Sequence, residues 1–399
     1  MKLVDIIGKV ISGEWGADDE DGDGVPVLRT TNFTNDGVVN YDDVVTRKIQ
    51  KKNLAVKFLR QGDILIEKSG GSDKQPVGRV VYFVEQERKY LFNNFTGLLR
   101  VQDQAKWLPR YVYYALFSNW LNGGTRPFEN RTTGLHNLQT ESYVKSFNVP
   151  EQSLTKQRKI VETLDCVEAL IKRRQQQLRT LDDLIKARFV EMFGEPRENP
   201  KNWAIYALRQ IIKNGNNGLS RRGRDRDGQI VLRLVELQDG YIDYSSTNRI
   251  VLTEAEREKY LLCERDFLFA RVNGNPDNVG RCAIFMPIAE PVYFNDHIIR
   301  VHFDDDIING QFLSVLLNSR YGKEQFRSHV KTSAGQYTIS QDGIGAILVP
   351  LPPLKMQLEF ASFVAQVDKS KTVIQKALDE AQLLFDSLMQ QYFGVRKIK

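Results

Sequence analysis

Two long stretches of this sequence carry apolar residues with the spacing of a coiled coil. In residues 151–194 the apolar side chains recur in steps of four and three, and the same steps return about 200 residues later in residues 352–399. These steps place the side chains on one narrow seam of a helix roughly 60 Å long. Because such a seam requires a partner in water, we predict that the two helices pack antiparallel against each other. The predicted seam residues are Ile160, Leu164, Val167, Ile171, Leu178, Leu181, Ile185, Phe360, Val364, Val367, Ile374, Leu378 and Phe385.

Capping residues mark where these helices begin and end, and charged residues interrupt their apolar seams. The first helix is predicted to start after Ser153, a suitable N-cap, and to stop at Gly194. The second is predicted to start after Pro353. Arg174 and Lys371 interrupt the two seams, where they either fix the register of the pair or extend their charged ends into water.

The segments outside the two helices also repeat, in the same order and at the same offset of about 200 residues. Each copy has short β-like runs separated by Gly, Asn and Asp, together with a helical run. This recurrence indicates an internal duplication. The matching segments are Val27–Tyr41 with Val231–Tyr244, the segment that begins with GDIL and ends at Arg79 with the segment that begins with RDFL and ends at Arg281, Tyr90–Asn94 with Val292–Asp296, and Gly134 and Leu138 with Gly335 and Ile339.

The chain therefore divides into four parts. We predict a first globular domain over residues 1–150, a long helix over 151–194, a second globular domain over 195–351 and a second long helix over 352–399. The predicted fold class is α+β, with two α/β domains separated by two long antiparallel coiled-coil helices and related by a pseudo-twofold repeat. The helical pair alone is equally compatible with a dimerisation device or a scaffold.

Composition excludes several classes of protein. Cys166, Cys263 and Cys282 have no CxxC spacing, and the 4 histidines share no spacing, so we predict no disulfide framework, no metal site and no cofactor. Cys166 lies in the first long helix and is expected to be buried or half-buried there. No apolar run approaches the ~20 residues of a membrane span, and the first residues do not resemble a signal peptide, so a cytoplasmic location is expected.

Charge and motifs limit the chemistry further. The net charge of +6 favours an anionic partner only weakly. The chain has no Asn/Asp/Ser-Pro-Pro-aromatic tetrapeptide of methyltransferases, no Walker loop and no glycine-rich dinucleotide loop. We therefore predict no catalytic residues.

In this order, the GDIL and RDFL runs that lead to VGR, the aromatic-Asn pair, the Val-Pro at each domain exit and the glutamine-rich helix resemble the specificity subunit of type I restriction-modification systems. The resemblance spans nearly the whole chain. It implies that each globular part is a target recognition domain that reads one half of a bipartite DNA sequence, and that the helices set the spacer and dock methyltransferase subunits. The implied partners are double-stranded DNA, two modification (methyltransferase) subunits and ATP-dependent restriction subunits, with no membrane and no catalysis by the chain itself.

Reading of DNA bases favours Arg or Lys against guanine and Asn or Gln against adenine, presented on loops. Two regions with this chemistry recur in both copies, and an arginine-rich run is unique to the second copy and suits phosphate contacts. Because the loops differ between the copies, we predict two different half-sites. The candidate DNA-binding residues are Lys68, Ser69, Ser72, Lys74, Arg126, Arg131, Thr132, Thr133, His136, Arg221, Arg222, Arg224, Arg271, Asn273, Asn275, Lys331, Thr332, Ser333 and Gln336.

Some alternatives stay open at this level. Arg79 and Arg281 of the two VGR steps suit a DNA contact and a fold-supporting salt bridge equally well. A stand-alone nuclease or methyltransferase with an unrecognised motif would be active without partners. A coiled-coil scaffold with protein-binding globular ends would bind no specific duplex.

Overall fold

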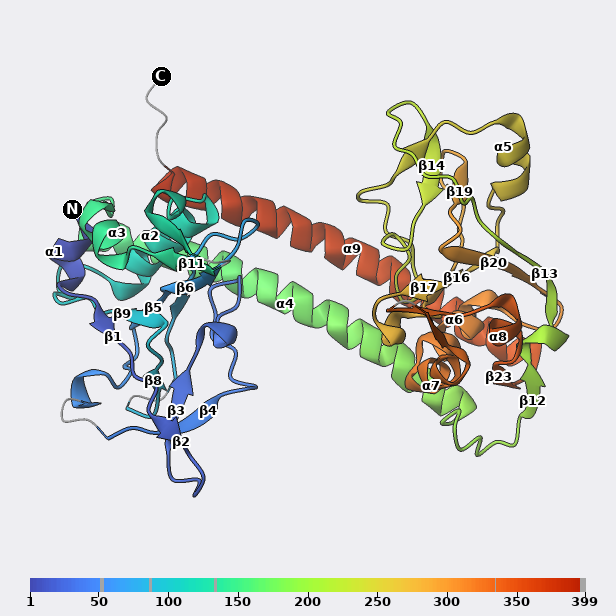
Figure 1. Ribbon diagram of the computed structural model, residues 1–399, viewed down its shortest axis with the longest axis horizontal. Coiled ribbons are helices and arrows are strands. Elements are labelled where there is room, and N and C mark those ends of the chain that lie inside the picture. Colours follow the sequence, from blue (N-terminus) through green and yellow to red (C-terminus); the bar gives the residue numbers. More distant parts are fainter. Residues whose placement is uncertain (51–53, 86–87, 133–134, 334, 395–399) are drawn as a thin grey trace. The chain divides into compact units, whose positions relative to one another are not determined.

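The computed structural model describes residues 1–50, 54–85, 88–132, 135–333 and 335–394 (Figure 1). The chain forms two compact units. Unit 1 comprises Met1–Gln175 with Lys376–Lys399, and unit 2 comprises Gln176–Gln375. Two helices of 40 residues, α4 (Leu154–Phe193) and α9 (Leu354–Phe393), contribute to both units. No helix in the described part of the chain is long and apolar enough to cross a membrane.

Unit 1 contains short strands and helices in addition to its parts of α4 and α9. Its helices, 3-10 turns and strands are α1 (Leu3–Ile7), β1 (Ile11–Ser12), β2 (Ala17–Asp18), β3 (Val25–Leu28), η1 (Thr30–Asn32), β4 (Val45–Lys48), η2 (Leu54–Val56), β5 (Ile64–Glu67), β6 (Ser69–Gly71), β7 (Val80–Tyr82), β8 (Leu91–Phe92), β9 (Thr96–Leu99), α2 (Pro109–Leu121), η3 (Arg126–Phe128), β10 (Glu129–Thr132), β11 (Leu135–Leu138) and α3 (Thr140–Ser146).

Unit 2 repeats this order with a few additions. Its elements are β12 (Ala204–Ala207), η4 (Leu208–Gln210), β13 (Ile212–Asn217), β14 (Gln229–Leu232), β15 (Arg249–Ile250), α5 (Glu254–Tyr260), β16 (Phe267–Ala270), β17 (Val272–Asn273), η5 (Pro276–Asn278), β18 (Cys282–Ile284), β19 (Val292–Phe294), β20 (Ile298–Phe303), α6 (Gly310–Asn318), α7 (Arg320–His329), β21 (Lys331–Ser333), β22 (Gln336–Thr338), α8 (Gln341–Gly345) and β23 (Leu348–Leu351).

The sheets of the two units share most of their topology, although the four-stranded sheet β2-β4-β3-β8 of unit 1 corresponds to a three-stranded sheet, β15-β14-β19, in unit 2. The order β1-β9-β5-β7 in unit 1 corresponds to β13-β20-β16-β18 in unit 2. In both units a parallel pair, β3 with β8 and β14 with β19, lies in a second sheet. The GDIL and RDFL runs lead into the inner strands β5 and β16, in which all residues are buried. The internal duplication predicted from the sequence is confirmed by this shared topology.

In unit 1 the beginning of α4 packs against the end of α9. Ile160, Leu164, Val167 and Ile171 of α4 share one core with Ala381, Phe385 and Met389 of α9. Leu378 is partly buried against this core. Because the start of one helix meets the end of the other, the helices run antiparallel, as predicted.

In unit 2 the roles of the two helices are exchanged. The end of α4, with Ile185, Phe189 and Phe193, packs against Phe360 and Val364 at the start of α9. The rings of Phe189 and Phe360 have centroids 5.5 Å apart and meet edge to face. Val367 is buried in the same core, and Leu181 packs partly against it.

The helix ends follow the local sequence. Ser153 precedes α4, and its Oγ accepts a hydrogen bond of 3.4 Å from the amide of Lys156. Gly194 follows the helix with φ +81°, a left-handed conformation that favours glycine. Lys371 does not enter the core, since its Nζ lies 2.7 Å from an Asp182 carboxylate oxygen on α4.

The expectation that Cys166 is buried or half-buried is wrong. Its side chain is exposed on α4. At 3.6 residues per turn, position 166 lies on the opposite side of the helix from Leu164, which faces the core.

Candidate nucleic-acid interface

In unit 1 the two predicted DNA-reading regions meet in one small sheet. β6 follows Lys68, and β10 and β11 follow Arg126; the three strands pair in the order β10-β11-β6. Gly71 of β6 pairs with His136 of β11. Residues 65 positions apart in the sequence therefore lie on neighbouring strands.

Unit 2 forms the same arrangement. β17, which follows Arg271, pairs with β22 through Val272 and Thr338, and β22 pairs with β21. The backbone shows that Lys68 and Arg271 are equivalent. The Lys68 carbonyl accepts a hydrogen bond of 2.8 Å from the amide of Leu138, and the Arg271 carbonyl accepts one of 2.9 Å from the amide of Ile339.

Among the unit 1 candidates, lysines and hydroxyls lie at or near the surface. Lys68 is half-buried with its Nζ 3.5 Å from Ser12 Oγ, and its burial, together with the charge of Lys57, lowers the pKa of its ammonium group. Ser69 is half-buried, whereas Ser72 and Lys74 are exposed.

The second region of unit 1 lies beside these residues. The Arg126 side chain is exposed and donates a hydrogen bond of 3.1 Å to the carbonyl of Asp73. Arg131 and Thr132 lie on β10. Thr133 and the neighbouring Gly134 lie outside the described residues.

His136 does not fit a role as a DNA contact. Its side chain is 6 % exposed, and its Nδ1 lies 3.0 Å from a Glu129 carboxylate oxygen. Its Nε2 lies 3.7 Å from Asp73. A ring that is buried between two carboxylates presents no free edge to a base, so we assign it to the support of the sheet.

In unit 2 several candidate DNA-binding side chains form hydrogen bonds with nearby backbone groups. Arg271 donates a hydrogen bond of 3.2 Å to the carbonyl of Asp296. The Oδ1 of Asn273 accepts from the amide of Asn275, and the Oδ1 of Asn275 accepts from the amide of Asp277. These side-chain oxygens shape the turn, which leaves the amide groups for other contacts. Lys331, Thr332 and Gln336 are exposed on β21 and β22, and Ser333 ends β21.

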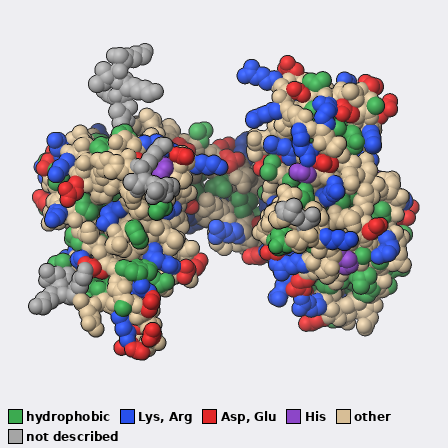
Figure 2. All heavy atoms as spheres, in the orientation of Figure 1, with side chains coloured by type: hydrophobic (Ala, Val, Ile, Leu, Met, Phe, Trp, Pro, Cys, Tyr) green, Lys and Arg blue, Asp and Glu red, His purple; other side chains and the backbone are tan. Residues whose placement is uncertain are grey.

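The arginine-rich run of unit 2 carries ion pairs. Arg221 makes a two-pronged interaction with Glu256, with distances of 3.1 and 2.9 Å. Arg222 lies 2.7 Å from Asp296 and 3.0 Å from the His297 Nε2. Arg224 is exposed. Figure 2 shows Lys and Arg side chains of unit 2 close to a His side chain and interspersed with Asp and Glu.

The two VGR arginines hold the fold. Arg79 lies 3.2 Å from the buried carboxylate of Glu67 and donates to the carbonyl of Thr30. Burial raises the pKa of Glu67, although the positive charge of Arg79 opposes this shift. Arg281 lies 3.0 Å from Asp239 and donates to the Gln238 and Asn278 side chains. Of the two roles considered from the sequence, the structure therefore favours the salt bridge.

Phe95 and His297 are neighbours of the site that sequence reasoning missed. The Phe95 carbonyl accepts a hydrogen bond of 2.8 Å from the amide of Lys68, and the His297 carbonyl accepts one of 2.8 Å from Arg271. Phe95 is 53 % exposed. Burial and the charge of Arg222 lower the pKa of His297. Each residue lies two positions after the Asn of the repeated aromatic-Asn pair, and this shared position in the two copies is the sequence pattern from which both residues could have been predicted.

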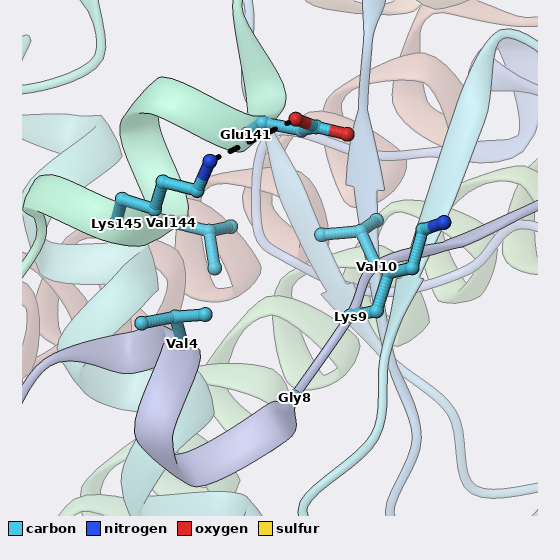
Figure 3. Close-up of a pocket in the computed structure, with 7 residues that line it drawn as sticks. All are labelled: Val4, Gly8, Lys9, Val10, Glu141, Val144 and Lys145. Carbon is cyan, nitrogen blue, oxygen red and sulfur yellow. Dashed lines mark ion pairs between the residues drawn. The ribbon is translucent and has the colours of Figure 1, made fainter.

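A cavity of about 300 Å³ lies apart from these strands, between α1, β1 and α3 (Figure 3). Val4, Val10 and Val144 line it, and Lys145 and Glu141 form an ion pair of 4.0 Å at its side. The described residues that line it include no nucleophile beside a base. We assign no chemistry to this cavity.

Comparison with known proteins adds the deciding observation. The sequence model of the family described as "Type I restriction modification DNA specificity domain" matches residues 1–180 and again residues 200–382. The chain belongs to this family. The two matches agree with the two copies found in the sequence and in the sheets.

Relatives with curated names align over most of this DNA specificity chain. The type I restriction enzyme StySPI specificity subunit of Salmonella potsdam is 28% identical over 383 residues, which cover 92% of this chain and 80% of the relative. The type I restriction enzyme EcoKI specificity subunit of Escherichia coli K12 is 24% identical, with 92% and 80% of the two chains covered.

Solved structures share the fold. The S subunit of a type I restriction-modification system from M. genitalium matches with a TM-score of 0.57 and 14% identity, over 98% of this chain and 95% of that chain. A chain from a structure titled for complex assembly and conformational transition of the type I R-M system matches with a TM-score of 0.53 and 13% identity, over 98% and 96%.

Proposed function

We propose that this chain is the DNA-recognition subunit of a type I restriction-modification complex, in which each domain reads one half of a bipartite target. The observation that carries the proposal is the paired three-stranded sheet, β10-β11-β6 and β17-β22-β21, which brings together polar and basic residues, several of them exposed, on and beside its strands in two copies. The family membership supports it.

Within this function we assign base reading to the small sheets and the residues beside them, where exposed lysines also contact phosphates, and we assign further phosphate contacts to the arginine-rich run. Lys74 and Arg126 are exposed in the first copy, and Lys331, Thr332 and Gln336 are exposed in the second. Different residues at equivalent places favour two different half-sites, because base edges are distinguished by the donors and acceptors that face them. Arg221 and Arg222 would exchange their carboxylate partners for phosphates.

The helices α4 and α9 set the spacer between the half-sites and dock two methyltransferase subunits, with restriction subunits joining the complex. The docking of partner subunits is supported by a similar protein that is named a type I restriction enzyme specificity subunit, and by a similar solved structure that is titled for complex assembly of the type I R-M system. Recognition of genomic DNA by such a complex would take place in the cytoplasm. The chain contributes recognition, and its partners contribute methyl transfer and cleavage.

One experiment tests the proposal. The chain is expressed with its cognate modification subunit, and methylated adenines are mapped across the host genome by single-molecule sequencing. We expect one motif with two specified halves and a fixed unspecified spacer. A continuous motif, or methylation that does not depend on this chain, would refute bipartite reading. Specific assembly with the modification subunit but no duplex binding would favour the scaffold alternative.

A further inference from the structure

Each long helix carries one glutamine that is completely buried. Gln157 of α4 and Gln357 of α9 both have 0 % of their surface exposed. A primary amide in such a place loses its hydration and requires hydrogen-bond partners. Both residues lie in the first turn of their helix and are related by the offset of the duplication.

Gln157 makes three hydrogen bonds to backbone groups of unit 1. Its Oε1 accepts from the amide of Leu108 at 2.9 Å. Its Nε2 donates to the carbonyl of Lys106 at 2.9 Å and to the carbonyl of Gln152 at 3.0 Å. The glutamine thus joins α4 to the segment that enters α2, because Leu108 is the N-cap of that helix.

Gln357 repeats this pattern bond for bond in unit 2. Its Oε1 accepts from the amide of Asn309, the N-cap of α6, at 2.8 Å. Its Nε2 donates to the carbonyl of Ile307 at 3.2 Å and to the carbonyl of Pro352 at 2.8 Å. In both copies one carbonyl acceptor lies two residues before the N-cap and the other lies five residues before the glutamine. We call each three-bond arrangement a clasp.

A clasp restrains rotation as well as separation. Three hydrogen bonds from one planar amide to two different backbone segments leave the globular part little freedom to turn about its own portion of the long helix. Packing also holds α6, because the ring of Phe312 lies against Phe193 of α4 with centroids 4.9 Å apart. Packing of apolar rings is less directional than hydrogen bonding. In unit 2 the clasp is therefore the directional contact between α9 and the segment that enters α6, whereas in unit 1 it acts beside further side-chain hydrogen bonds.

We propose that Gln157 and Gln357 are positioning residues that fix the angle at which each domain meets DNA, and thereby the length of the spacer that the complex accepts. The proposal rests on the proposed function. One additional base pair moves a half-site by about 3.4 Å and turns it by about 35° around the duplex. A domain held by an intact clasp rejects the displaced half-site, whereas a domain freed to turn accepts it.

The two junctions differ in their other contacts. In unit 1, Arg110 donates a hydrogen bond of 2.9 Å to Asp165 of α4, and the Tyr111 hydroxyl donates one of 3.0 Å to the carbonyl of Pro150. The equivalent residues of unit 2 are Gln311 and Phe312, which carry neither a cation nor a hydroxyl. Loss of the unit 2 clasp is therefore expected to have the larger effect.

The test compares Gln157→Ala and Gln357→Ala with the wild-type chain, each expressed with the cognate modification subunit. The readout is the ratio of adenine methylation at targets whose spacer is one base pair too long or too short to methylation at the normal spacer. We expect this ratio to rise on the order of tenfold for Gln357→Ala and by less for Gln157→Ala, with the half-site sequences unchanged.

Matched controls separate orientation from stability. Leu65→Ala in unit 1 and Leu232→Ala in unit 2 remove buried side chains of the sheets, which are 0% and 1% exposed and belong to cores without α4 or α9 residues. They are expected to lower the melting temperature and total methylation while the spacer ratio stays at the wild-type value. If an alanine variant fails to accumulate, Gln357→Met and Gln157→Met, which keep the side-chain length, replace it.

Two failures are distinguishable. A wild-type motif without a fixed spacer would refute the proposed function itself. A wild-type motif with a fixed spacer, together with clasp variants that keep that spacer as strictly as the controls do, would refute the positioning role alone.

Discussion

At the scale of single residues, the sequence identifies side chains whose chemistry allows them to contact DNA. It does not show which of these side chains already form hydrogen bonds or ion pairs with other residues of the fold. Arg79 is held by Glu67 and by the carbonyl of Thr30, 49 residues away in the chain. His136 is held by Glu129 and Asp73. Thr30 and Asp73 are distant in sequence from the side chains that they hold, and even the nearer Glu67 and Glu129 are brought into contact by strand pairing, which local residue patterns do not reveal. The assignment of the exposed Lys74 and Lys331 as DNA contacts remains a prediction.

The exposed lysines lead to a prediction about salt. If Lys74 and Lys331 contact phosphates, Lys74→Ala and Lys331→Ala each lower the slope of log affinity against log salt concentration by about 0.9, because one fewer counterion is released. The measurement is duplex binding by the complex with its modification subunit over a range of salt concentrations. Lys145→Ala, an exposed lysine on α3 beside the cavity that lies apart from the small sheets, is the control and should leave the slope unchanged. Unchanged slopes in all three variants would exclude these phosphate contacts.

Glu256 leads to a prediction about pH. Hydrogen bonds from Arg221 and from the Thr253 amide lower the pKa of Glu256 from its ordinary 4.5 to about 2. A carboxylate with a lowered pKa stabilises the fold above its ordinary pKa, and this stabilisation is lost as the pH falls from about 4.5 towards 2. The difference in melting temperature between the wild type and Glu256→Gln should therefore be constant from pH 5 to 8 and shrink below pH 4.5.

Thermal unfolding between pH 3 and 8 checks this expectation. Glu258→Gln, an exposed position on the same helix α5, removes an equal charge and serves as the control. A difference for Glu256→Gln that is independent of pH, or that grows on acidification, would contradict the assignment.

At the scale of elements, the long helices were the most predictable part of the chain. Periodicity alone indicates their length and apolar face, because a regular helix repeats the same geometry at each turn. The small sheets β10-β11-β6 and β17-β22-β21 were not predicted, since their strands have three or four residues at most and carry polar side chains. The sequence analysis named these segments as separate candidate loops, and only strand pairing shows that they are adjacent.

The two seams lead to a prediction about stability. Leu164 and Val364 are equivalent and are 0% and 1% exposed. Leu164→Ala should lower the free energy of unfolding by about 2–5 kcal/mol, and Val364→Ala by a smaller amount, because each leaves a cavity in its core. Leu170→Ala, on α4 but 38% exposed, should change it by about 0.5 kcal/mol or less. Denaturant unfolding of the full chain measures all three, and equal losses for Leu164→Ala and Leu170→Ala would contradict the packing described.

At the scale of the whole molecule, duplication was visible in the sequence because both copies keep the order of their segments. The fold class followed from it, and the shared strand order β1-β9-β5-β7 and β13-β20-β16-β18 confirms the two copies. The DNA target does not follow from the sequence, because recognition depends on where side chains meet base edges rather than on residue type alone.

A domain exchange tests the independence of the two copies. Replacing residues 1–150 by those of a homologue should change one half of the methylated motif and leave the other half and the spacer unchanged. Methylation mapping of the exchanged chain, beside the reciprocal replacement of residues 195–351, checks this expectation. A change in both halves after a single replacement would show that the domains do not read DNA separately.

The clasps also bear on how such chains diversify. Gln157 and Gln357 bind only main-chain atoms of the domains that they hold, at Lys106 and Leu108 and at Ile307 and Asn309. Every residue type offers the same carbonyl, and every type except proline offers the same amide. The three hydrogen bonds of a clasp therefore place almost no demand on the side chains of the attached domain. Recombination between genes can bring in a domain with unrelated loops, and these hydrogen bonds re-form without a change in the long helix.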